Sequence, residues 1–128
     1  MILLSPPSSI EIDLDGDYEV RTVLKAKSVP GYDKEMYGCD LLEVTSRDGK
    51  TQIPVSLVYK KETMDKAKAG ETVPIHLYGY GSYGTSIETD WDITRLPLLN
   101  RGMMYAVAHI RGGGGEHTYS FYLCPASH

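Results

Sequence analysis

Residues 103–110, "MMYAVAHI", form an almost unbroken apolar run. A strand that is apolar on both faces is typical of a sheet with parallel members, where both faces are covered. Before it come "TVPIHLY" (72–78), a second expected strand, and "DITRLPLLNRG" (92–102), a short expected helix capped by Asp92 and ended by Gly102. We therefore expect an α/β fold that runs strand, glycine loop, short helix, buried strand.

Two alternating segments near the amino terminus predict a β-hairpin. They are "IEIDL" (10–14) and "DYEVRTVLKAK" (17–27), and Asp15-Gly16 lies between them. Glycine accepts the positive φ that a tight hairpin turn needs. Because a hairpin alone is not stable, we expect this one to belong to a larger sheet, formed either by later residues of this chain or by sequence not present here.

A second hairpin is expected further along the chain. It comprises "CDLLEVTS" (39–46), a turn at "RDGK" (47–50) and "TQIPVSLVYKK" (51–61). Proline has no backbone N–H to donate to a ladder. Pro54 therefore predicts that its strand lies at a sheet edge or turns its donor-less side to solvent.

Polar stretches separate these elements. "SVPGYDKEMYG" (28–38) contains Pro30-Gly31 and is interpreted as a linker between two structural units. "ETMDKAKAG" (62–70) is interpreted as a connection with one helical turn that ends at Gly70.

Charge and cysteine content exclude several classes of function. The 128 residues include 13 basic and 17 acidic side chains, a net charge of −4, which argues against nucleic-acid or anionic-membrane partners. Cys39 and Cys124 form no CxxC pair, so neither a disulfide framework nor a zinc site is indicated. No apolar stretch is long enough to span a bilayer, and residues 1–9 make a poor signal peptide. We expect a cytoplasmic protein without metal or cofactor.

The glycine-rich segment "LYGYGSYG" (77–84) allows three interpretations, of which nucleotide binding is the first. Gly79, Gly81 and Gly84 match G-x-G-x-x-G after a strand. In that motif a helix starts at the third glycine and points its amino terminus at a pyrophosphate. Here the acidic stretch "TSIETDWD" (85–92) follows instead, so the match is weak.

The second interpretation is a nucleophilic serine, and the third is an oxyanion-binding loop. A nucleophile elbow, G-x-S-x-G, needs glycine two residues before Ser82, where Tyr80 stands, so Ser82 is expected to be a turn residue. In α/β-hydrolases a glycine-rich turn supplies a donor to the tetrahedral intermediate. A phenol, with a pKa of about 10, stays protonated at neutral pH and can donate. This third interpretation explains the tyrosines and the glycines together.

Three segments resemble the prolyl oligopeptidase family of serine peptidases: 47–61, 77–84 and "RLPLLNRGMMYAVAHIRGGG" (95–114). The tyrosine-rich loop is most similar to the oligopeptidase B branch, and the resemblance runs from about Tyr18 to Gly114. It implies an enzyme with a β-propeller and an α/β-hydrolase domain that carries Ser, Asp and His. On this basis the chain divides into the end of a propeller blade (1–28), a linker (29–38), the first part of the catalytic domain (39–115) and an unmatched tail (116–128).

The resemblance also implies roles for residues of the loop. Tyr80 would donate its hydroxyl to the oxyanion, together with a backbone N–H beside the nucleophile. Tyr83 would line the substrate pocket, and Gly79, Gly81 and Gly84 would shape the loop. The implied reaction is hydrolysis of short peptides by acyl transfer, after Lys or Arg if the branch is right, without a cofactor.

Some parts of the sequence depart from the family. No G-x-S-x-G occurs in the 128 residues, so the triad is not contained in them and the chain alone is expected to be an inactive fragment. The tail "EHTYSFYLCPASH" (116–128) matches nothing in the family. The alternatives are a non-catalytic homologue or binding piece and, less favoured, a nucleotide-binding module.

Histidine and arginine residues near the glycines invite other roles. His109, at the end of the buried strand, is expected to be structural, and His117 lies in the unmatched tail. The two have no metal-ligand spacing, and His76 is given no role. Arg111 is expected to anchor the glycine turn through carbonyls or a carboxylate.

Overall fold

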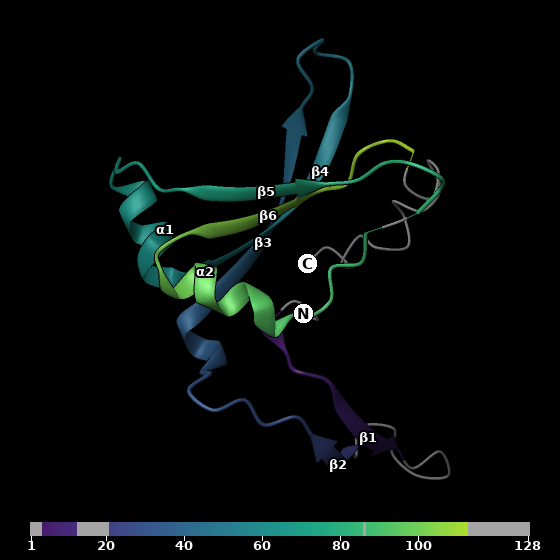
Figure 1. The fold of residues 1–128 in the computed structure, drawn as a ribbon, viewed down its shortest axis with the longest axis vertical. Helices are drawn as coiled ribbons and strands as arrows, with labels where there is room; N and C mark the ends of the chain where they lie inside the picture. The colour runs from purple at the N-terminus through teal and green to yellow at the C-terminus, as the bar shows by residue number, and fades with distance from the viewer. Residues whose placement is uncertain (1–3, 13–20, 86, 113–128) are drawn as a thin grey trace.

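The computed structural model describes residues 4–12, 21–85 and 87–112, which form two β-sheets (Figure 1). A two-stranded sheet and a four-stranded sheet of order β3-β4-β6-β5 are present. Their strands are β1 (Ser8–Ile12), β2 (Arg21–Ala26), β3 (Tyr37–Thr45), β4 (Gln52–Lys60), β5 (Ile75–Gly79) and β6 (Met104–Ala108). The helical elements are the 3-10 turns η2 (Lys34–Met36) and η3 (Ile93–Arg95) and the helices α1 (Lys61–Lys68) and α2 (Leu96–Asn100).

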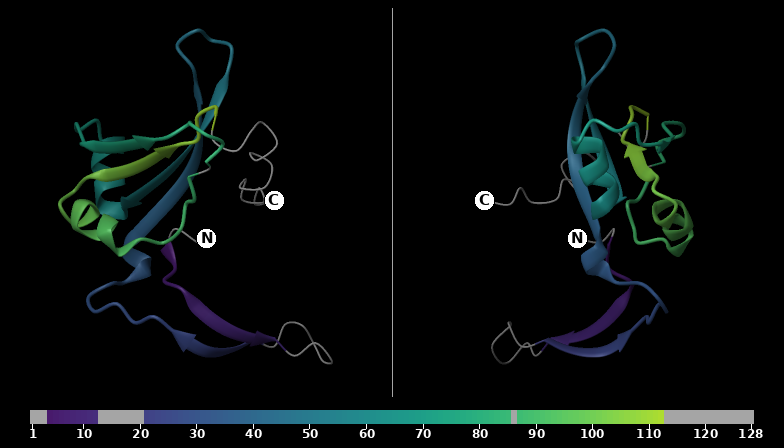
Figure 2. Two further views of the ribbon diagram at one scale, coloured as in Figure 1. Left: turned by 45° about the vertical axis from the view of Figure 1, so that its right-hand side comes forward. Right: turned by 90° about the vertical axis from the view of Figure 1, so that its left-hand side faces the viewer.

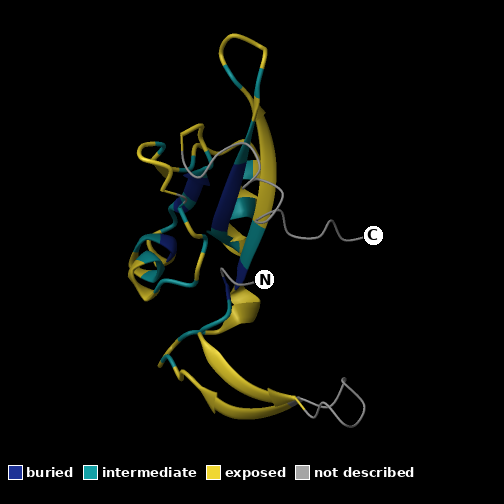
Figure 3. Ribbon diagram, turned by 90° about the vertical axis from the view of Figure 1, so that its right-hand side faces the viewer, coloured by how far each residue is buried: buried dark blue, intermediate teal, exposed yellow. Residues whose placement is uncertain are grey.

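The small sheet is the antiparallel pair predicted near the amino terminus. β1 pairs with β2, while the Asp15-Gly16 turn lies outside the described residues. The register passes from Ser9↔Lys25 to Ile10↔Val23, so Leu24 is an extra residue that makes a bulge. The pair extends away from the larger sheet (Figure 2), and the residues of β1 and residues 22–26 of β2 are exposed (Figure 3).

The four-stranded sheet confirms the predicted second hairpin and the buried strand. β3 and β4 pair antiparallel, β6 joins β4 antiparallel, and β5 joins β6 in parallel. In β6, Val107 is only 1% exposed, because the strand has neighbours on both sides and side chains packed on both faces. The mixed sheet with a parallel pair is the arrangement that the apolar run predicted.

The prediction that Pro54 places its strand at a sheet edge is wrong. β4 lies between β3 and β6. The Pro54 carbonyl accepts a hydrogen bond from the His109 N–H at 2.9 Å, and the reciprocal bond cannot form because proline has no N–H. The first residue pair of the ladder is Val55↔Ala108. Pro54 therefore ends the pairing of β4 with β6.

Two hydrophobic clusters cover the opposite faces of this sheet. Leu57 belongs to one cluster and Val58 to the other, and consecutive strand residues point to opposite faces. α1 contributes Met64 to the Leu57 side, and α2 contributes Leu99 to the Val58 side. α1 is eight residues long, more than the single turn expected, and Gly70 follows it with φ +90°.

The short helix before β6 is confirmed with its predicted boundaries. The Asp92 carboxylate accepts hydrogen bonds from the Thr94 N–H (2.9 Å) and hydroxyl (2.8 Å). One 3-10 turn precedes α2, and Gly102 ends the segment with φ +79°. None of the helices in the described part of the chain is long and apolar enough to cross a membrane.

Candidate functional site

Two glycine-containing segments meet at one end of the four-stranded sheet. Residues 80–84 follow β5, which ends at Gly79, and residues 109–112 follow β6. Because β5 and β6 are parallel, their carboxyl ends lie at the same edge, which is where open α/β sheets bind ligands. The Gly84 N–H donates to the Gly112 carbonyl at 3.0 Å, so the two segments are in contact.

Gly81 and Gly112 are required at this contact because their backbones approach closely. A Cβ at Gly81 would overlap the Arg111 carbonyl oxygen, and one at Gly112 would overlap the Gly81 carbonyl oxygen. Gly112 also has φ +86°, in the left-handed region that favours glycine. The loop after β5 therefore rests directly on the backbone after β6.

Tyr80 lies at the start of this loop, between Gly79 and Gly81. Its side chain is 39% exposed. No group in residues 4–12, 21–85 and 87–112 forms a hydrogen bond with its hydroxyl. The structure thus places a phenol donor at the carboxyl edge of the parallel strands, available to a ligand.

Tyr83 has an unusual backbone conformation. Its φ is +58°, that of Gly84 is +68°, and the Thr85 N–H donates to the Ser82 carbonyl at 3.2 Å. Two successive positive φ values at the centre of a turn are characteristic of type I′, in which Asn, Asp and Gly are preferred. Its ring is 96% exposed. Ser82 is confirmed as a turn residue.

The loop lacks the features of a dinucleotide-binding motif. After Gly84 no helical residue occurs in the described chain before Ile93, and α2 has only five residues. The Gly84 amide donates within the protein and not outward. Within the described residues, no three His, Cys, Asp or Glu side chains are grouped to hold a metal ion.

His109 packs beside the site as a structural residue. Its Nε2 atom lies 2.9 Å from the Ser56 hydroxyl oxygen, within hydrogen-bond distance. Burial lowers the pKa of its imidazole below the usual 6.5, which favours the neutral ring. The expected structural role is thereby supported, while His76 stacks on the Tyr105 ring with 5.0 Å between ring centroids.

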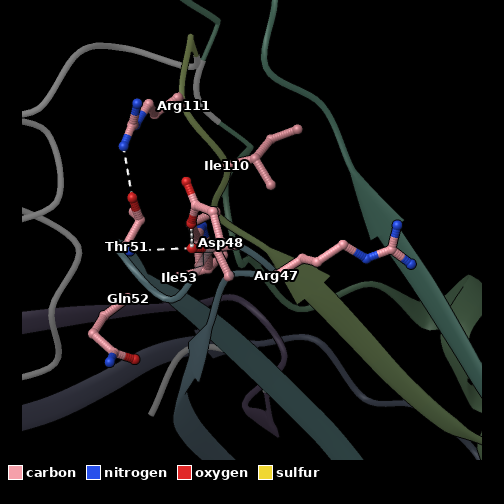
Figure 4. Close-up of a pocket in the computed structure, with 9 residues that line it drawn as sticks. Arg47, Asp48, Thr51, Gln52, Ile53, Ile110 and Arg111 are labelled. Carbon is pink, nitrogen blue, oxygen red and sulfur yellow. Dashed lines mark hydrogen bonds between the residues drawn. The ribbon is translucent and has the colours of Figure 1, made fainter.

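Arg111 contacts the β3–β4 hairpin. Its Nη2 atom donates to the Thr51 hydroxyl oxygen at 2.7 Å (Figure 4). The expected contacts with the glycine turn involve residues 113–115, which lie outside the described residues. The pKa of Asp48 is lowered by the Ser46 hydroxyl, by the Lys50 N–H and by the nearby Arg111 charge. Sequence reasoning missed this contact because its two residues are sixty positions apart.

A pocket of about 490 Å³ lies between the tip of this hairpin and the segment after β6 (Figure 4). It is lined by Ser46, Arg47, Asp48, Thr51, Gln52, Ile53, His109, Ile110 and Arg111. Its walls come from two distant segments of the chain, so no local pattern could have predicted it.

Several curated proteins are similar to this chain, although no family profile matches it. Dipeptidyl aminopeptidase BI from Pseudoxanthomonas mexicana is 48% identical over 93 residues, which cover 73% of this chain and 12% of that protein. Protease 2 from Moraxella lacunata is 34% identical over 112 residues, 87% of this chain and 15% of that protein. The chain thus spans less than a sixth of the length of these relatives.

Solved structures share both the fold and the sequence of this segment. Oligopeptidase B from Leishmania major matches with a TM-score of 0.71 and 38% identity, over 87% of this chain and 15% of that protein. Oligopeptidase B from Trypanosoma brucei with covalently bound antipain matches with a TM-score of 0.72 and 38% identity, over 88% of this chain and 15% of that protein. With sequence and structure in agreement over most of its length, the chain belongs to the prolyl oligopeptidase family of serine peptidases, as a short segment of its members.

Proposed function

We propose that this chain supplies the oxyanion-binding loop of a serine oligopeptidase, with the Tyr80 hydroxyl as the side-chain donor. The supporting observation is the position of that hydroxyl. Tyr80 is 39% exposed, its hydroxyl has no hydrogen-bond partner among the described residues, and the residue lies at the carboxyl edge of β5 and β6. A preorganised neutral donor at such an edge suits a reaction in which negative charge develops on a carbonyl oxygen.

The chemistry follows from what a phenol can do. When a serine oxygen attacks a peptide carbonyl, the C=O π electrons move onto oxygen and a tetrahedral oxyanion forms. The Tyr80 O–H would donate to that oxygen and keep its proton throughout. The contact of Gly81 with the Arg111 carbonyl holds the loop before the substrate arrives, so little reorganisation is needed during the reaction.

The remaining roles are proposed from the family. The nucleophile, its aspartate and its histidine would lie in polypeptide other than these residues, which contain no G-x-S-x-G. The β1–β2 pair would be the end of a propeller blade, within 1–28, and residues 39–115 the first part of the catalytic domain. Tyr83, with its exposed ring, would line the pocket for short peptides.

We propose a preference for cleavage after Lys or Arg from the similarity of the chain to the oligopeptidase B branch. Identity is 38% to the oligopeptidase B structures and 28% to a structure from an analysis of two prolyl endopeptidases. The complete enzyme would therefore cleave after basic residues more readily than after proline.

A chimaera tests the role of Tyr80. Residues 37–112 would replace the matching segment of oligopeptidase B from Trypanosoma brucei, which supplies the nucleophile. Tyr80→Phe should lower kcat by about 10² to 10³, the usual cost of one oxyanion donor, and leave KM nearly unchanged. Tyr78→Phe, in the preceding strand, is the matched control and should retain activity. Equal kcat values for Tyr80→Phe and the parent chimaera would refute the proposal.

A further inference from the structure

We propose that Arg111 is a positioning residue for Tyr80, acting through its hydrogen bond to Thr51. The bond ties the segment after β6 to the β3–β4 hairpin, and the Tyr80 loop rests on that segment. The inference depends on the proposed function of Tyr80 for its catalytic consequence. Its structural part, the fixing of the loop, can be tested without any activity.

The hairpin tip provides a rigid attachment point. The Ser46 N–H donates to the Thr51 carbonyl at 2.8 Å, and the Thr51 N–H donates to the Ser46 hydroxyl at 3.1 Å. Asp48 accepts from the Ser46 hydroxyl and from the Lys50 N–H at 3.1 Å. Because the tip satisfies its own polar groups, the Thr51 hydroxyl is held in a defined place.

The segment after β6 needs such an attachment because the sheet ladder has ended. Pro54 cannot donate to this strand, and the last cross-strand bond is the one from the His109 N–H. Beyond it, the Arg111 side chain reaches back to Thr51 at 2.7 Å. A bond from a guanidinium is charge-assisted and stronger than one between neutral groups.

The position of Arg111 is transmitted to Tyr80 through backbone contacts. The Arg111 carbonyl lies directly against Gly81, the residue after Tyr80. The Gly112 carbonyl accepts from the Gly84 N–H at the other end of the loop. Both ends of the loop that carries Tyr80 therefore contact the two residues whose placement the Arg111 side chain fixes.

Amide hydrogen exchange in the complete 128-residue chain tests the structural part. Arg111→Met and Thr51→Val should each speed exchange of the Gly84 amide by about tenfold. This factor corresponds to the lower end of the range of stabilisation by a hydrogen bond to a charged group. The double variant should exchange no faster than either single one, because both remove the same bond. Arg111→Lys should recover part of the protection, and Arg47→Met, in the same pocket, should change nothing. Amides of Leu57 and Val107 report global stability and should stay constant.

Two results would overturn this part. One is a Gly84 amide that is unprotected in the parent chain. The other is a Gly84 exchange rate that is the same in the parent and in Arg111→Met.

Kinetics of the chimaera test the catalytic part. Arg111→Met should lower kcat about tenfold at unchanged KM, and this loss should vanish in a Tyr80→Phe background. A loss of equal size in both backgrounds would show that Arg111 does not act through Tyr80 and would overturn the inference. If Tyr80→Phe alone has no effect, the proposed function fails, while the exchange experiment still decides whether Arg111 fixes the loop.

Discussion

Single residues at the site differ in how far the sequence could predict them. A loop-shaping role for the glycines was implied by the family resemblance, and the structure gives a physical reason at Gly81, whose backbone lies too close to the Arg111 carbonyl for a side chain. The positive φ of Tyr83 could not be predicted, because a tyrosine gives no local signal for a conformation that Asn or Gly adopts more easily. Such strain is found preferentially at functional sites, in keeping with the proposed pocket role of Tyr83.

His109 makes the stability of the fold depend on pH. Burial lowers the pKa of its imidazole, while in the unfolded chain it titrates near the usual 6.5. At pH values just below 6.5 the unfolded state therefore binds more protons than the folded state does. The free energy of unfolding thus falls as the pH falls through this range. Urea unfolding at pH 7.5 and 5.5 should show a smaller loss of unfolding free energy in His109→Gln than in the parent. The same loss in both proteins would contradict this assignment.

At the scale of elements, local sequence patterns were sufficient to predict the strands and helices whose structure depends on neighbouring residues in the chain. Apolar alternation predicted the strand pairs, and Asp92 with Gly102 predicted the helix between β5 and β6. The edge-strand prediction failed for Pro54, because whether a proline lies on an edge strand depends here on pairing with β6, fifty or more positions away. The bulge at Leu24 likewise depends on register between two strands.

Loss of the helix cap should weaken the segment before β6. Asp92→Ala removes both bonds to Thr94 and should lower the unfolding free energy by about 1 kcal/mol. These bonds also lower the pKa of Asp92 below its usual 3.8. The stabilisation that the ionised carboxylate gives to the fold is therefore lost as the pH falls below 3.8. Asp90→Ala is the matched control, because among the described residues only the backbone carbonyl of Asp90 accepts a hydrogen bond, from Arg95. Equal destabilisation of the two variants, measured by urea unfolding, would refute the capping role.

At the scale of the whole molecule, apolar surface is exposed along one sheet edge. In β5, Ile75 is 55% exposed and Leu77 is 65% exposed, and within the described part of the chain the strand has a neighbour on one side only. An edge of this kind offers unpaired backbone groups and apolar side chains to other chains. The local pattern of β5 does not indicate this edge, because the residues of a strand follow the same pattern whether or not a neighbouring strand is present.

We expect this edge to cause self-association of the 128-residue chain. Leu77→Lys should reduce association, because an edge lysine opposes pairing with a second copy. Thr72→Lys adds the same charge at an exposed position before β5 and is the control. Sedimentation velocity over a range of concentrations measures the effect. Equal association of both variants and the parent would exclude the β5 edge as the contact.

In the proposed mechanism, the Tyr80 hydroxyl donates a single hydrogen bond to the developing oxyanion. A peptide aldehyde forms a tetrahedral adduct with a serine nucleophile and places such an oxygen in the site. The most direct measurement is its inhibition constant against the chimaera with Tyr80 and with Phe at this position. We predict inhibition about 100-fold weaker without the hydroxyl. Equal inhibition of the two proteins would contradict the account.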